Sequence, residues 1–204
     1  MVIINFAYGI IPLNSVMKAF HVLDCDCQDQ IATEALDWVQ SNTDLLTLND
    51  SWQYNNFWNK IDYKDFLSKN STLMAYCSDL KLKIREVAIL SAHDQSGVIL
   101  HVDEGPVSAK INFPILNTAD TYTEWYSVDL SNVPQSVSQF GQPYHNLHDW
   151  DISNLEKIAE VEMTRPVVFN SSIPHRVRIG PTAKLPRIVI SCMFFTEPLD
   201  YLNE

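Results

Sequence analysis

Two residues near the middle of the chain, His101 and Asp103, have the types and the spacing of metal ligands. They end the apolar segment Val98–Asp103, which is predicted to form a strand, and a Gly-Pro turn follows them. Successive side chains of a strand point to opposite faces, so residues two apart share a face, with Cα atoms about 6.6 Å apart. At that separation an imidazole and a carboxylate can bind one metal ion.

A third ligand must come from another part of the chain, because an isolated His-x-Asp pair also occurs often by chance. His175 is the best candidate, since it follows Pro174 at the start of another predicted strand, residues 175–179. Two imidazoles and one carboxylate on one face of an ion leave positions open for further ligands, as in non-haem Fe(II) sites. We therefore predict a metal site of His101, Asp103 and His175.

One arginine, Arg187, lies in the very apolar segment Pro186–Phe194, with Ser191 on the same strand face. An inward guanidinium is costly unless it meets an anion, and its planar fork suits two-point binding of a carboxylate. We predict that Arg187 holds a ligand carboxylate. The alternative is an edge-strand arginine in a surface salt bridge. Arg176 and Arg178 lie on the opposite face of their predicted strand from His175, so both should point away from the metal.

The elements that would position these residues are short strands. From about residue 81 to 196, segments rich in β-branched and aromatic residues alternate with turn formers, a pattern typical of an antiparallel sandwich or barrel. Before them we predict a strand and helices that cover one face of a sheet, at residues 2–7, 28–40, 63–68 and 71–80. We also predict a loop at 132–151, a helix at 152–161, and a single domain over residues 1–204.

Composition excludes several function classes. Net charge is −11, with 25 acids against 14 bases, which argues against nucleic acid as the main partner. No apolar run approaches the ~20 residues that cross a bilayer, and we expect no signal peptide. The four cysteines match no two-pair zinc pattern, although the C-x-C pair could hold a soft metal. Incidental thiols are the preferred reading, with a reducing, cytoplasmic setting; the oligomeric state stays open.

The order His101-x-Asp103, His175 and Arg187 resembles the 2-oxoglutarate/Fe(II)-dependent dioxygenase superfamily. The sequence pattern around these residues is also similar to that of the superfamily, over roughly residues 81 to 196. It includes the segments H-V-D, K-I-N-F-P-I-L-N, V-V-F-N-S-S-I-P-H and R-I-V-I-S. The chain is most similar to small bacterial and phage-type oxygenases, with some likeness to the aspartyl/asparaginyl hydroxylase branch. That branch usually has glycine where this chain has Asp103, so its two-histidine iron site is not expected here.

The resemblance implies a mainly β fold, a double-stranded β-helix (cupin-like jelly roll) with N-terminal helices on one sheet. It implies Fe(II), 2-oxoglutarate and O₂ as cofactors, with Arg187 and Ser191 at the far carboxylate of 2-oxoglutarate. Lys110 and Asn112 resemble residues that help to hold 2-oxoglutarate in the hydroxylase branch. The implied activity is hydroxylation of an amino acid, a peptide side chain or a small metabolite, with release of succinate.

Other residues could have similar roles but are less favoured. His93-Asp94 and His145-x-x-His148 lie in predicted loops. Ordinary packing is the preferred reading of several aromatic residues that could line a pocket: Trp52, Tyr54, Phe57, Trp58, Tyr122, Trp125, Tyr126, Phe140, Tyr144 and Trp150. Two competing functions remain, a cupin-like metalloenzyme that does not use 2-oxoglutarate and a non-catalytic jelly-roll binding module.

Overall fold

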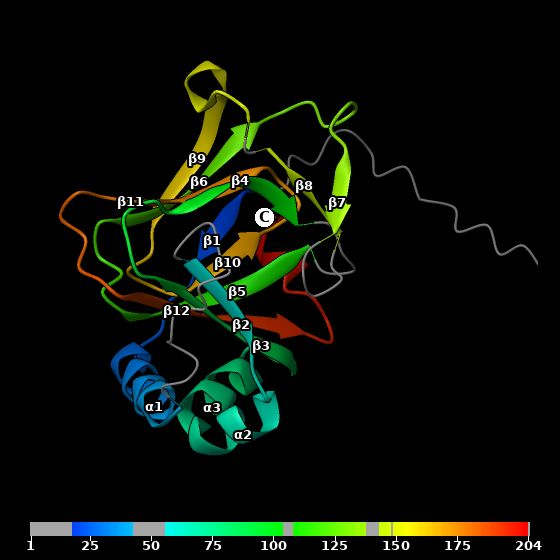
Figure 1. Cartoon of the computed structure of the whole chain (residues 1–204). Coiled ribbons are helices and arrows are strands. Elements are labelled where there is room, and N and C mark those ends of the chain that lie inside the picture. The colour runs from blue at the N-terminus through cyan, green and yellow to red at the C-terminus, as the bar shows by residue number, and fades with distance from the viewer. Residues whose placement is uncertain (1–17, 43–55, 104–107, 138–142, 148, 204) are drawn as a thin grey trace, which may run out of the picture.

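A computed structural model describes residues 18–42, 56–103, 108–137, 143–147 and 149–203, and the predicted strand at 2–7 lies outside them (Figure 1). The helices are α1 (Gln28–Ser41), α2 (Tyr63–Lys69) and α3 (Ser71–Asp79), with short 3-10 turns at Ile152–Asn154 and Leu199–Tyr201. The strands are β1 (Phe20–Val22), β2 (Asn56–Lys60), β3 (Ile84–Ala92), β4 (Val98–Asp103), β5 (Ala109–Leu116), β6 (Thr121–Ser127), β7 (Gln135–Val137), β8 (Pro143–Asn146), β9 (Glu156–Glu162), β10 (Val167–Asn170), β11 (His175–Ile179) and β12 (Arg187–Phe194).

The strands form two antiparallel sheets. The first has the order β1-β10-β5-β12-β3-β2, and the second has the order β7-β8-β4-β11-β6-β9. Strands far apart in the chain are neighbours, since β12 lies between β3 and β5, and β11 lies between β4 and β6. This pairing of early with late strands across two facing sheets is the double-stranded β-helix, or jelly roll, that the sequence predicted.

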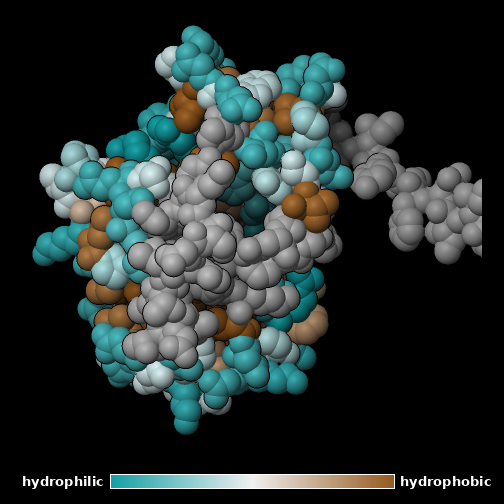
Figure 2. Space-filling model, viewed as in Figure 1, coloured by the Kyte–Doolittle hydropathy of each residue, from teal (hydrophilic) through white to brown (hydrophobic). Residues whose placement is uncertain are grey.

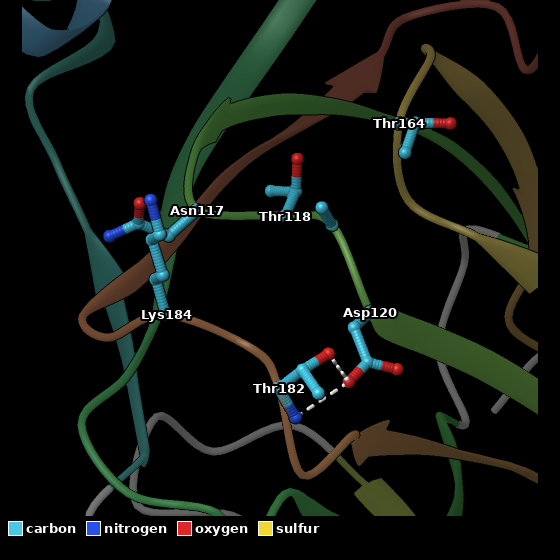
Figure 3. Close-up of a pocket in the computed structure, with 7 residues that line it drawn as sticks. Asn117, Thr118, Asp120, Thr164, Thr182 and Lys184 are labelled. Carbon is cyan, nitrogen blue, oxygen red and sulfur yellow. Dashed lines mark hydrogen bonds between the residues drawn. The ribbon is translucent and has the colours of Figure 1, made fainter.

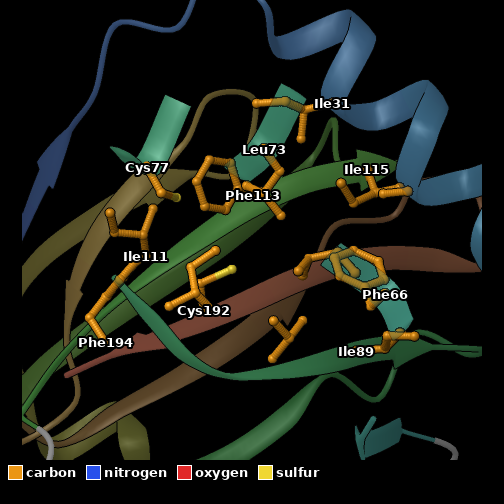
Figure 4. Packing of buried hydrophobic residues seen from close by; sticks show 14 of the residues in the cluster. Ile31, Phe66, Leu73, Cys77, Ile89, Ile111, Phe113, Ile115, Cys192 and Phe194 are labelled. Carbon is orange, nitrogen blue, oxygen red and sulfur yellow. The ribbon is translucent and has the colours of Figure 1, made fainter. Parts of the chain in front are cut away.

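The three helices cover the outer face of the first sheet, as Figure 1 shows. Helix α1 buries Ile31, Ala35 and Val39 at intervals of four, which places one apolar stripe against the sheet. Figure 4 shows how helix residues meet strand residues such as Phe113 and Cys192 in one apolar core. Asp62 begins α2 by accepting hydrogen bonds from the backbone of the first turn. The helices predicted at 28–40, 63–68 and 71–80 are therefore confirmed.

The helix predicted at residues 152–161 is wrong. Only Ile152–Asn154 forms a 3-10 turn, and Glu156–Glu162 is strand β9, paired with β6 along its length. The Glu, Lys and Ala content favours a helix locally, but the backbone pairs at the open edge of the second sheet. Ala159 and Val161 alternate with exposed neighbours, which is the period of a strand. The predicted loop at 132–151 likewise contains the short strands β7 and β8.

A buried carboxylate ties the outer face of the second sheet together. Glu124 on β6 accepts hydrogen bonds from Arg176 Nε at 2.6 Å, Arg178 Nε at 2.8 Å and the Tyr126 hydroxyl at 2.7 Å. Arg176 and Arg178 therefore face away from His175, as alternation predicted. Burial alone would raise the pKa of Glu124, but the hydrogen bonds from Arg178, Tyr126 and Arg176 outweigh it and lower the pKa strongly.

Replacing this carboxylate by an amide tests its contribution to stability. Glu124→Gln is expected to lower the free energy of unfolding by about 2 kcal/mol at neutral pH, below the usual cost for a fully buried pair because both arginines reach water. A lowered folded pKa stabilises the fold above the ordinary value of 4.5, and the effect is lost as the pH falls through the folded pKa. Urea unfolding of both proteins should therefore show a difference that shrinks at acid pH. A difference independent of pH would contradict this account.

Candidate metal centre

Strand pairing brings the two histidines together from distant parts of the chain. His101 on β4 is the direct partner of His175 on β11, so both side chains share the inner face of the second sheet, with ring centroids 4.3 Å apart. The pairing shifts register between His175 and Val177, which pairs with Val98, and Gly97 lies just before β4. Gly97 has φ +70°, and a Cβ there would collide with the Val177 carbonyl oxygen, so this close approach requires glycine.

Both imidazoles are oriented by the backbone. Nδ1 of His101 lies 2.8 Å from the Ile99 carbonyl oxygen, and Nδ1 of His175 lies 2.8 Å from the Ile173 carbonyl oxygen. A carbonyl only accepts, so each Nδ1 carries a proton, and Nε2 is the ring nitrogen left to bind a metal ion. A backbone carbonyl on the far nitrogen is a common way to fix a metal-binding histidine.

Asp103 completes the group. Its Oδ1 lies 3.5 Å from Nε2 of His101, while its Oδ2 accepts from Nζ of Lys110 at 2.6 Å. One ligand atom from each of His101, Asp103 and His175 lies within 4.8 Å of the other two. One carboxylate oxygen is thus held by an ammonium group, and the other points toward the histidines.

The ionisation of His175 and Asp103 suits a cation. Burial, aided by the charge of His101, lowers the pKa of His175 to about 3, so this imidazole is neutral at physiological pH. Burial alone would raise the pKa of Asp103, but Lys110 and His101 outweigh it and hold the pKa well below its usual range. For His101, burial opposes the charged form, yet the hydrogen bond and charge of Asp103 raise its pKa. A neutral imidazole and a carboxylate are the forms that metals bind.

Aromatic rings enclose the inner side of the group. Phe169 on β10 meets the His175 ring edge-on, with centroids 4.6 Å apart, and it also contacts Trp125. Phe20 on β1 stacks on Trp125, which donates from Nε1 to the Asn170 carbonyl oxygen. Trp125 is therefore a core residue that backs the histidines, in agreement with the packing interpretation. In the view of Figure 2 a hollow opens between the two sheets, and the residues at its floor are coloured hydrophilic.

Arg187 begins β12 and points between the sheets, only 4% exposed. Because β12 lies between β3 and β5, the edge-strand alternative is wrong. Its Nε donates to Oγ1 of Thr121 at 3.2 Å. Thr121 precedes Trp125, the partner of His175, by four residues, or about 13 Å of strand, so the guanidinium lies further along β6, away from the histidines.

The Arg187 charge has no protein counter-ion in the described ranges. Thr121 is its hydrogen-bond partner there, and burial without a neighbouring anion lowers the pKa of Arg187 to about 10. The group thus stays charged at neutral pH. A buried, unpaired guanidinium is unfavourable unless a ligand supplies the anion.

The other residues expected to bind 2-oxoglutarate are Asn112, Ser191 and Lys110, and they differ in whether a protein group already engages them. Asn112 and Ser191 are direct partners on β5 and β12, both are buried, and Oδ1 of Asn112 has no hydrogen-bond partner among the described residues. A polar atom left unpaired in this way is typical of a ligand site. Lys110, in contrast, donates a hydrogen bond to Asp103. It therefore lies beside His101, Asp103 and His175, which we call the metal group.

The rival ligands do not assemble. Across the described ranges, the group of His101, Asp103 and His175 is the one set of three or more metal-binding side chains close enough to share an ion. His145 lies opposite Val102 on β8, on the other face from His101, and His148 lies outside the described residues. The Cys25 and Cys27 sulfurs are 3.6 Å apart, but no third ligand in the described residues joins them at that range.

Sequence reasoning missed two contributions to the site. Strand β8 extends the second sheet beside β4, pairing Tyr144 with Asp103 and Asn146 with His101 on the same face. This segment has Gly and Pro nearby and only a short strand, so its sequence favours a loop. Thr121 carries no signal beyond its position at the start of a strand.

A second hollow of about 450 Å³ lies away from the metal group. It is lined by residues of the β5–β6 turn, the segment before β10 and the segment before β12, among them Asn117, Asp120 and Lys184. Figure 3 shows Asp120 accepting hydrogen bonds from the backbone and hydroxyl of Thr182. No residue of the metal group lines this hollow. None of the helices in the described ranges has both the length and the apolar character needed to span a bilayer.

Comparison with known proteins supports the architecture. No family model matches the chain, and no curated protein sequence matches it. Among solved structures, the epimerase SnoN, in complex with Fe³⁺, α-ketoglutarate and nogalamycin RO, is 10% identical with a TM-score of 0.51, covering 92% of this chain and 86% of its own.

HygX from Streptomyces hygroscopicus, with nickel and 2-oxoglutarate bound, is 12% identical with a TM-score of 0.47, covering 86% of this chain and 82% of its own. AviO1 from Streptomyces viridochromogenes Tue57 is 14% identical with a TM-score of 0.48, covering 89% and 91%. These identities are too low to carry function from one protein to another. The likeness to SnoN shows that the chain shares its fold, the double-stranded β-helix.

Proposed function

We propose that the protein is an Fe(II)- and 2-oxoglutarate-dependent oxygenase that acts on a small molecule or on an amino-acid or peptide side chain. The observation that carries this proposal is the convergence of His101, Asp103 and His175 within 4.8 Å of one another. The open ligand positions of such a group suit a bidentate cosubstrate and O₂. Hydroxylation is the default outcome of this chemistry.

The residues present fit this metal. The donor set is two imidazoles, whose Nδ1 atoms are held by backbone carbonyls so that Nε2 is left for the metal, and one carboxylate oxygen, while Lys110 restrains the other oxygen. Fe(II) bound there would supply, with O₂ and 2-oxoglutarate, the oxidising chemistry that yields succinate and carbon dioxide. Phe169 and the ring stack behind it exclude water from the inner side of the group.

The cosubstrate is proposed from the charge distribution between the sheets. Arg187 presents a buried cation that has no anionic partner in the described part of the chain, further along β6 from the histidines. A dianion that binds the metal at one end and the guanidinium at the other would satisfy both. Asn112 and Ser191 lie on the inner face of the first sheet and could contact its middle. The complex of SnoN with Fe³⁺ and α-ketoglutarate supports this choice.

The test is the formation of succinate by purified protein. With Fe(II), ascorbate and 2-oxoglutarate, slow succinate release is expected even without a substrate, and a chelator should abolish it. Panels of amino acids, peptides and small metabolites would then be screened for faster release. Succinate formed equally with and without iron would overturn the proposal. A metalloenzyme that does not use 2-oxoglutarate would release none, and a non-catalytic module would also show no metal-dependent binding of 2-oxoglutarate.

A further inference from the structure

The turn between β5 and β6 contacts Arg187 at two points. Asn117 Nδ2 donates to the carbonyl oxygen of Pro186 at 2.9 Å, which fixes the backbone just before Arg187. Thr121 Oγ1 accepts from Arg187 Nε at 3.2 Å, which fixes the side chain. Thr121 is itself fully buried at the start of β6. One turn therefore controls both the position and the direction of the guanidinium.

The Thr121 hydroxyl has a fixed direction. It donates its single hydrogen to the Thr118 carbonyl oxygen at 2.7 Å, so its lone pairs remain to accept from Arg187. Asn117 and Asp120 both adopt left-handed backbone conformations, with φ of 53° and 56°, which give this turn its shape. The series from Thr118 through Thr121 to Arg187 is thus a chain of hydrogen bonds in which each donor and acceptor is determined.

The contact with Thr121 determines which nitrogens of Arg187 remain available to bind a ligand. A guanidinium has five N–H groups in one plane, and the Nε–H is used by Thr121. In the described ranges the two terminal nitrogens have no other protein partner. They can therefore meet a carboxylate end-on with two parallel hydrogen bonds, which is the strong and directional form of the interaction.

We propose that Thr121 is a positioning residue for the cosubstrate: its hydroxyl holds Arg187 so that the guanidinium meets the far carboxylate of 2-oxoglutarate end-on. This inference rests on the proposed function. It assigns to Thr121 an effect on 2-oxoglutarate affinity and none on metal affinity, because Thr121 acts through Arg187 alone.

The experiment compares Thr121→Val, which has the same shape without the hydroxyl, with Thr121→Ser, which retains it. Calorimetry on Mn(II)-loaded protein measures the Kd of 2-oxoglutarate, and a separate titration measures the Kd of Mn(II). Loss of a hydrogen bond to a charged group is expected to weaken 2-oxoglutarate binding about 10-fold in Thr121→Val. Thr121→Ser should stay near the wild type, and Mn(II) affinity should be equal in all three proteins.

Combination with Arg187→Met separates this inference from the proposed function. If Thr121 acts through Arg187, adding Thr121→Val to Arg187→Met should cause no further loss of 2-oxoglutarate affinity. Wild-type affinity in Thr121→Val, with strong loss in Arg187→Met, would overturn the role of Thr121 and leave the proposed function standing. Equal losses in the valine and serine variants would also overturn it, since the hydroxyl would not be the cause. Wild-type affinity in Arg187→Met would instead contradict the cosubstrate site itself.

Discussion

Replacing His175 by alanine is expected to abolish metal binding and to lower iron-dependent succinate formation by more than about 100-fold. Loss of a residue that merely supports a ligand costs roughly 10- to 100-fold, and loss of a ligand should cost more. His175 is buried, neutral, and oriented by the Ile173 carbonyl, so no other described side chain can take its place beside His101. Calorimetry with Mn(II) measures the first effect, and succinate release measures the second.

The matched control for this change is His145→Ala. His145 lies on β8, next to β4, but its side chain is on the opposite face from His101. The His145→Ala protein should bind Mn(II) with the same affinity as the wild type. If His175→Ala kept wild-type affinity while remaining folded, the assignment of the third ligand would be wrong. If both histidine variants lost affinity equally, a general loss of structure would explain the result.

Arg187→Met is expected to weaken 2-oxoglutarate binding by about 100-fold or more without changing Mn(II) affinity. A two-point hydrogen bond from a buried guanidinium to a carboxylate is among the stronger interactions in a site, and methionine keeps most of the side-chain length without the charge. The same change should not reduce the free energy of unfolding of the ligand-free protein. It removes a buried charge that has no counter-ion in the described residues, and an apolar group of similar size is tolerated there.

Weaker binding of 2-oxoglutarate without a loss of stability would distinguish a residue that binds the ligand from one that supports the fold. Arg165→Met serves as the control, since Arg165 is 57% exposed and pairs with Asp24 on the surface. It should change neither property by a measurable amount. A large loss of stability in Arg187→Met, with unchanged 2-oxoglutarate affinity, would mean that the guanidinium supports the fold and has no role at the cosubstrate.

The fold and much of the site could be predicted because strand alternation is a strong signal. The spacing of His101 and Asp103 requires a shared face, and the position of His175 at the start of its strand agrees with direct pairing to His101. Alternation also placed Arg176 and Arg178 on the opposite face, where both bind Glu124.

The remaining features depend on pairing between distant segments. Glu156–Glu162 has a helical composition and becomes a strand because the edge of β6 is open to it. The contact of Thr121 with Arg187 depends on the start of β6 lying beside the start of β12, which no local pattern encodes. Resemblance associates Lys110 with the cosubstrate, which stays a prediction; its pairing with Asp103 in the structure could not be read from the sequence, since it depends on where β5 passes the end of β4.

The most direct test of the account is a titration of 2-oxoglutarate into the protein in the absence of O₂, with and without Mn(II). The metal group and Arg187 bind opposite ends of one cosubstrate in this account, so tight binding requires the ion. We expect saturable binding of one 2-oxoglutarate per chain with Mn(II) present, and binding at least about 10-fold weaker after the metal is removed. Equal affinity in both conditions, or no binding in either, would contradict a metal-centred cosubstrate site.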